Sequence, residues 1–172
     1  MNNRWLIAAV ALWLLMAGIS EAGMRQLVLR VDGLACPFCA YGLEKKLPAL
    51  PGVTSYDADL REGKVFVGLE SAASVVMGRV QQAVREAGFT LRSVMLTASG
   101  TLTETTDGWI LGVSDTDQFL LVGAEGLKQQ LAEWARQGQV VEVTGTLQTR
   151  ETGPQGLSIE DIRPVGQTVQ DP

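Results

Sequence analysis

The sequence Gly33-Leu34-Ala35-Cys36-Pro37-Phe38-Cys39 separates two segments whose apolar residues recur with different periods. Residues 26–31 before it alternate polar and apolar side chains, which predicts a half-buried strand. Apolar residues after it recur at helical spacing over residues 40–47, which predicts a helix that ends near Pro48. Two thiols three positions apart at a helix start can turn toward one point. The positive end of the helix there favours the thiolate form.

The segments that follow continue this alternation of strand and helix. The pattern predicts strands at residues 56–60, 65–69 and 90–96, and a second helix at residues 76–87 with Gly88 just beyond its end. The order βαββαβ predicts an α+β, ferredoxin-like domain with both helices on one face of an antiparallel sheet.

The second half of the chain is mostly strand. Strand patterns occur at residues 101–103, 109–113, 119–122, 140–147 and 157–162, and one helical pattern at residues 127–136. Three strands, a helix and two strands predict a small OB-like β-barrel. Gly112 and Gly145 suit the bends of such a barrel.

Charge separates the two halves. Residues 23–96 carry a net charge of about +2, and residues 97–172 carry about −7. We therefore expect domains at residues 24–96 and 97–166, joined at the short polar segment Thr97–Gly100, and a tail at residues 167–172. The acidity of the second half opposes binding of nucleic acid, which requires a positive groove.

The N-terminal residues have the pattern of a secretory signal peptide. Arg4 precedes an apolar run from Trp5 to Ala17, and Ser20-Glu21-Ala22 offers small residues for cleavage. The alternative is a retained membrane anchor, but the run of about 13 residues is shorter than the ~20 that span a bilayer. We expect residues 1–22 to be removed near Ala22, which leaves a monomer in the periplasm without stable membrane insertion.

Histidine is absent from the chain, and Cys36 and Cys39 are its only cysteines. No Ser-His-Asp triad and no histidine-rich metal cage can form. Two thiolates favour soft ions such as Cu(I) or Hg(II). Zinc is a third candidate, although a closed structural zinc site requires four ligands. No catalytic residue and no organic cofactor is predicted.

The order strand, Gly-x-x-Cys-x-x-Cys, helix, two strands, helix, Gly-Phe, strand resembles the heavy-metal-associated domain family over residues 24–96. That family includes periplasmic mercury-binding proteins and copper chaperones. The resemblance implies that Cys36 and Cys39 are metal ligands and that the partner is a metal transporter or another metal-binding protein. Leu34 and Ala35 differ from the usual Met and Thr of the family, and Phe89 favours its bacterial members.

A thiol-disulfide oxidoreductase is the main alternative, since Cys-Pro-Phe-Cys also resembles the active site of glutaredoxin-like proteins. A thioredoxin-type fold, however, has the order βαβαββα and a cis-proline opposite its cysteines. The first half contains no proline after Pro51. We therefore expect an exported protein that binds and transfers a soft metal ion, and not an enzyme.

Two further expectations concern side chains away from the cysteines. Met77 and Met95 are expected in the core, not as a third metal ligand. The sheet face opposite the helices is expected to hold the second domain, the alternative being two independent domains on a flexible joint. By strand alternation, the residues on this face are Val28, Arg30, Lys64, Phe66 and Arg92.

Overall fold

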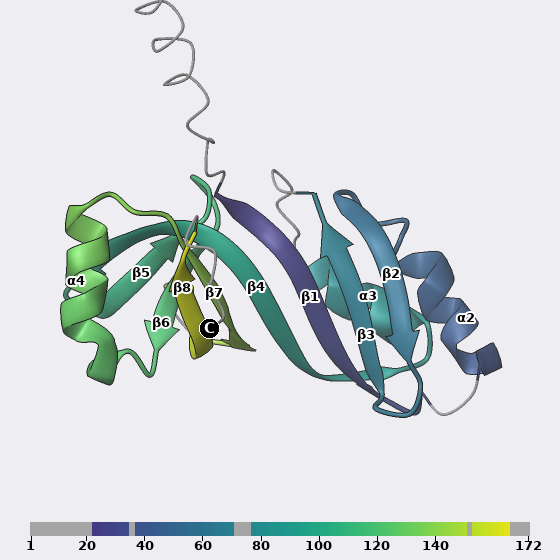
Figure 1. Cartoon of the computed structure of the whole chain (residues 1–172). Helices are drawn as coiled ribbons and strands as arrows, with labels where there is room; N and C mark the ends of the chain where they lie inside the picture. Colours follow the sequence, from purple (N-terminus) through teal and green to yellow (C-terminus); the bar gives the residue numbers. More distant parts are fainter. Residues whose placement is uncertain (1–21, 35–36, 71–76, 151–152, 166–172) are drawn as a thin grey trace, which may run out of the picture.

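The computed structural model describes residues 22–34, 37–70, 77–150 and 153–165, and Figure 1 shows its helices and strands. The elements in chain order are β1 (Gly23–Asp32), α2 (Pro37–Lys46), β2 (Val53–Asp59), β3 (Lys64–Leu69), α3 (Met77–Glu86), β4 (Thr90–Thr105), β5 (Gly108–Gly112), β6 (Gln118–Val122), η1 (Glu125–Leu127), α4 (Lys128–Arg136), β7 (Val141–Gln148) and β8 (Gln155–Pro164). None of the helices within these ranges is long and apolar enough to cross a bilayer. The predicted signal peptide and tail lie outside the described residues, apart from Ala22.

The first half has the predicted order βαββαβ. Its antiparallel sheet has the strand order β2-β3-β1-β4, and in the view of Figure 1 α3 lies behind the sheet and α2 is seen beside β2. The predicted helical faces are the buried ones, with Leu43 and Leu47 from the first helical segment and Val80 and Val84 from α3. The ferredoxin-like architecture of this half is therefore confirmed.

The second half closes into a five-stranded barrel. Neighbouring strands pair in the order β4-β5-β6-β8-β7, and β7 returns to pair with β4. The strands β6 and β8 run parallel, and α4 lies in the connection between β6 and β7. The second β domain expected from the strand pattern is therefore present.

The expected join between the two halves is not a linker. The strand β4 continues from Thr90 to Thr105 through Thr97–Gly100. Residues Met95–Ser99 pair with β1 on one edge and with β7 on the other. The polar residues that suggested a loop belong to the strand because their side chains have partners: the hydroxyl groups of Thr97 and Thr144 lie 3.0 Å apart across β4 and β7.

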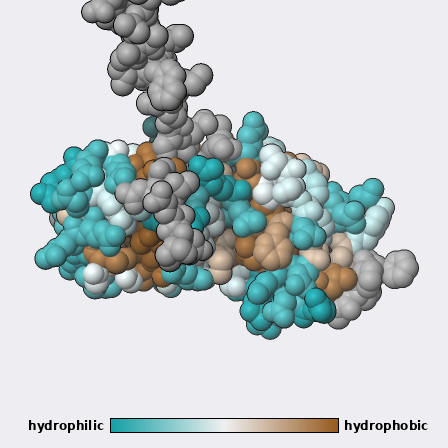
Figure 2. All heavy atoms as spheres, viewed as in Figure 1, coloured by the Kyte–Doolittle hydropathy of each residue, from teal (hydrophilic) through white to brown (hydrophobic). Residues whose placement is uncertain are grey.

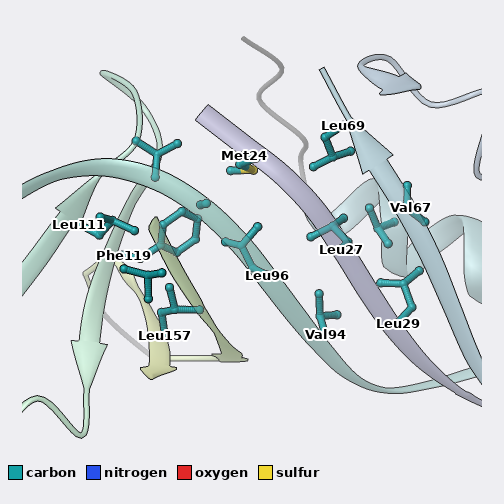
Figure 3. Packing of buried hydrophobic residues seen from close by; sticks show 14 of the residues in the cluster. Met24, Leu27, Leu29, Val67, Leu69, Val94, Leu96, Leu111, Phe119 and Leu157 are labelled. Carbon is teal, nitrogen blue, oxygen red and sulfur yellow. The ribbon is translucent and has the colours of Figure 1, made fainter. Parts of the chain in front are cut away.

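The hydrophobic core runs without interruption from one half into the other. Figure 3 shows Leu96 of β4 between Leu27 of β1 and the barrel residues Phe119 and Leu157. These residues belong to one cluster of buried side chains. The sheet face that α2 and α3 cover thus continues as the barrel interior, since Leu96 and Ala98 pair with Gly145 and Val143 of β7.

The expectation that the second half packs on the opposite sheet face is wrong. The barrel joins the first half edge to edge through β4, and the face that carries Val28 and Phe66 faces the viewer in Figure 1. Figure 2 shows hydrophobic side chains over β1 and β3 on this side. A flexible joint is excluded as well, because a strand paired on both edges cannot act as a hinge.

A polar network crosses this outer face between the two halves. Arg25 Nε donates to the hydroxyl of Ser99, which is fully buried, at 3.0 Å. The same nitrogen lies 3.3 Å from Oε2 of Glu142 on β7. The other oxygen of Glu142 accepts a hydrogen bond of 2.5 Å from Arg163 on β8. Opposite charges therefore do meet between the halves, but along the sheet and not between stacked faces.

Two glycines allow the strands of the barrel to approach closely. A Cβ added at Gly100 would lie 2.3 Å from the carbonyl oxygen of Gly112, and one at Gly145 would lie 2.2 Å from that of Ser158. At Gly112 the nearest atom would be 3.7 Å away, which is ordinary contact. The prediction that the barrel requires glycine at position 145 agrees with these contacts. The same requirement, predicted for Gly112, instead applies to Gly100 on the paired strand.

We predict that Gly100→Ala destabilises the protein by about 1–3 kcal/mol, because backbone atoms must move to admit the methyl group. Gly112→Ala, a change of the same size across the same strand pair, is expected to be neutral or stabilising by up to about 1 kcal/mol. The free energy of unfolding in urea, followed by tryptophan fluorescence, measures both. Equal effects of the two substitutions would contradict the packing described for Gly100.

Candidate metal centre

The predicted metal loop begins where β1 ends and finishes where α2 begins. Gly33 follows β1 with a φ of +84°, a left-handed conformation that favours glycine. Leu34 is only 3% exposed and anchors the loop in the core.

The two predicted ligands lie at the limit of the described structure. Cys36 is outside the described residues, and Cys39 is the third residue of α2, with its side chain outside the description. Their roles as ligands therefore remain predictions. The structure describes the frame that holds their backbone.

Two backbone segments lie beside the loop. The amide of Val31 donates to the carbonyl of Gly63 at 2.9 Å, which attaches the end of β1 to the β2–β3 turn. Asp32 pairs with Thr90, so the start of β4 lies on the other side. A Cβ at Gly33 would be 3.8 Å from Cδ1 of Phe89, which places that aromatic ring next to the loop.

The end of α3 positions Phe89. Gly88 has a φ of +88°, and its amide donates to the carbonyl of Arg85 at 2.9 Å. The amide of Phe89 donates to the carbonyl of Val84 at 3.1 Å. These bonds end the helix as the sequence predicts at Gly88, and they direct the chain toward the loop.

The middle of α2 is positioned by a contact that sequence reasoning missed. Gly42 lies against the residue that follows α3, since an added Cβ would be 3.3 Å from that of Ala87. Farther along α2, Lys46 Nζ forms an ion pair of 2.8 Å with Glu86. A glycine within an otherwise helical pattern was the available signal, because close helix packing is one reason to place glycine there.

Charged side chains of both signs surround the loop end of the sheet. Asp32 pairs with Arg92, and Lys64 lies 3.7 Å from Glu62. Asp59 accepts hydrogen bonds of 2.9 and 3.1 Å from the backbone amides of the β2–β3 turn. Arg30, beside Lys64, and Arg61, in the turn, add positive charge at this end, together with the N-terminus of α2.

Glu86, a carboxyl group of the first half whose pKa is shifted, lies away from the loop. Hydrogen bonds from Lys46 and Gln82 lower the pKa of Glu86 below its usual value. Glu86 is the last residue of α3 and contacts the far end of α2 from the loop. The carboxylate of Glu86 therefore forms an ion pair between the two helices and does not contact the loop.

Neither methionine lies at the loop. Met77 is partly buried against the core, as predicted, at the opposite end of α3 from Phe89. Met95 was predicted in the core, but it lies on the outer sheet face, paired with Val28. Within the part of the chain that the structure describes, no group of three or more His, Cys, Asp or Glu residues is placed to hold a metal ion.

This frame resembles those of known proteins. Residues 28–90 match the model of the heavy-metal-associated domain. A copper chaperone named CopZ from Staphylococcus aureus is 32% identical over 66 residues, which are 38% of this chain and 96% of that protein.

Two solved structures show related likenesses. A CopZ metallochaperone is 30% identical, covering 39% of this chain and 98% of that one, with a TM-score of 0.36. Oxidized MerP from Ralstonia metallidurans CH34 is 21% identical, covering 41% and 96%, with a TM-score of 0.36. On the family match and on the near-complete coverage of the CopZ sequence, the chain belongs to the heavy-metal-associated domain family.

Proposed function

We propose that the protein binds one soft metal ion, Cu(I) or Hg(II), between the thiolates of Cys36 and Cys39 and passes it to a metal transporter or another metal-binding protein. The observation that carries this proposal is the family match. Cys36 and Cys39 fall within residues 28–90, which match the heavy-metal-associated domain, and the chain covers 96% of a protein named copper chaperone.

The donor set favours a site that loads and releases its ion. The chain offers two thiols and no histidine, so the protein supplies two soft ligands where a closed zinc site would need four. An open position lets a thiolate of the partner bind the ion before the bonds to Cys36 and Cys39 break. The ion then moves by ligand exchange, and no oxidant or reductant is required for the transfer.

The frame supports such a site by holding the loop at one end of the sheet. Gly33 and Leu34 hold its first part, and the first turn of α2 supplies unpaired backbone N–H groups near the second cysteine. Among the described residues, no group of three or more His, Cys, Asp or Glu is placed to hold the ion, so its retention depends mainly on the two thiolates themselves.

The remaining parts of the chain complete the proposal. Residues 1–22 act as a signal peptide, and the mature monomer works in the periplasm. Residues 24–96 form the metal-binding domain, and residues 97–166 form an OB-like domain. Residues 97–172 contain no Cys, His or Met, so the OB-like domain offers no soft ligand. We assign it to docking or spacing.

We predict that the reduced mature protein binds one soft ion per chain and that Cys36→Ser together with Cys39→Ser abolishes binding. Native mass spectrometry with Cu(I), Hg(II) and Zn(II) in competition gives both the stoichiometry and the preferred ion. Met77→Leu with Met95→Leu is the matched control, because it removes two thioether sulfur atoms of the first half and leaves both thiols in place. An unchanged number of bound ions per chain in the double serine variant would contradict the assignment of Cys36 and Cys39 as the ligands.

The second prediction separates metal transfer from thiol-disulfide chemistry. The element order β1-α2-β2-β3-α3-β4 differs from the βαβαββα order of thioredoxin-type enzymes. We expect no turnover above background when the protein is offered insulin or a scrambled disulfide substrate, with a glutaredoxin as positive control. Turnover that disappears in Cys36→Ser would favour the oxidoreductase and overturn the carrier.

A further inference from the structure

The strand β4 has an edge that is only partly paired. On the side facing away from β1, β7 pairs with it over Met95–Gly100. No strand in the described part of the chain pairs with that side over Leu91–Val94. The two strands separate there, so the ladder stops while β4 continues toward the metal loop.

A cleft of about 130 Å³ lies along this unpaired stretch. One wall is α3, through Met77 and Gln81, and the other is formed by residues 147–149 and Gln155 of the β7–β8 segment. This volume is well below the ~300 Å³ at which pockets for small organic ligands begin. The cleft is therefore too small to enclose an organic cofactor.

The residues that line the cleft indicate which class of ligand it can bind. An unpaired strand edge presents backbone N–H and C=O groups that another extended chain can pair with. Apolar side chains and uncharged polar ones line the cleft around that edge, and Arg92 is the one charged residue among them. The side chain of Arg92 contacts Asp32 and is 64% exposed to solvent. A carboxylate of an incoming chain can reach it from solvent.

We propose that this cleft binds an extended, acidic segment of a partner polypeptide, which adds to the sheet as a strand along Leu91–Val94 with a carboxylate against Arg92. The partner segment extends the hydrogen-bond ladder that β7 forms with the same edge of β4 from Met95 onward. Main-chain hydrogen bonds provide the affinity, and the contact with Arg92 selects for acidic segments.

This surface is independent of the cysteines but adjoins the loop that carries them. Leu91 is two residues beyond Phe89, whose ring lies beside Gly33. The Leu91 end of the cleft is thus the end nearer the metal loop, and the backbone contacts of a bound partner involve neither Cys36 nor Cys39. Failure of metal binding and failure of peptide binding can be told apart, because the double serine variant should bind peptide with unchanged affinity.

The test uses the whole mature protein and a set of blocked octapeptides of alternating valine and threonine, with one aspartate placed at each position in turn. Backbone amide shifts are recorded during titration. We expect saturable shifts at residues 91–94 and 147–149, with a Kd below about 1 mM for the best peptide. The same peptide methylated on every backbone nitrogen keeps its side chains but should not bind.

Variants at neighbouring positions provide matched controls. Gln81→Trp places a large side chain at the cleft and should abolish binding, whereas Gln82→Trp, at the adjacent exposed helix position outside the cleft, should not. Arg92→Gln should weaken acidic peptides about two- to fivefold. Arg79→Gln, on the same domain but outside the cleft, should leave the affinity unchanged.

Four results would overturn the proposal. They are the absence of shifts with the entire peptide set, shifts confined to other residues, binding of the methylated peptide, and unchanged binding in Gln81→Trp. A fifth is a concentration-dependent shift at residues 91–94 without peptide, because that would identify a second copy of the chain as the occupant.

Discussion

The strand β4 is the constraint on which both halves depend. Five consecutive residues, Met95–Ser99, pair with β1 on one edge and with β7 on the other. The last strand of the α/β half is therefore also the first strand of the barrel. Because the two halves share hydrogen bonds and buried side chains along this strand, one cannot rotate against the other without breaking both ladders.

The side chains of this strand suit the two environments that it separates. Leu96 and Ala98 face the apolar side, which α2 and α3 cover in the first half and which becomes the barrel interior in the second. Thr97 and Ser99 face outward and bond to Thr144 and Arg25. Small residues are required where the barrel closes, since Gly100 almost touches the backbone of Gly112. The polar character of this stretch thus comes from the outer face of a strand.

The position of the metal loop is a consequence of the same sheet. The loop lies beyond the end of β1, where Asp32 pairs with the start of β4, and the barrel begins several residues farther along. Backbone hydrogen bonds and the left-handed conformation of Gly33 fix the start of the loop. The Arg25–Glu142–Arg163 network acts elsewhere, between β1, β7 and β8.

The sequence alone determined the local structure and the chemistry of the loop. Alternation in residues 26–31, helical spacing in residues 40–47 and the glycine at position 88 each depend on neighbours along the chain, and each agrees with the structure. The restriction to two soft ligands also follows from composition, because a chain with two cysteines and no histidine has no others of comparable affinity.

Only the tertiary structure decided how the halves meet and which residues position the loop. Polar residues at Thr97–Gly100 have the composition of a linker until Thr144 and Arg25 are brought beside them. The contact of Gly42 with Ala87, the outward position of Met95 and the incomplete ladder at Leu91–Val94 likewise depend on segments far apart in sequence. Local periodicity reports which face of an element is apolar. It carries no information about which distant strand or helix will occupy its edge.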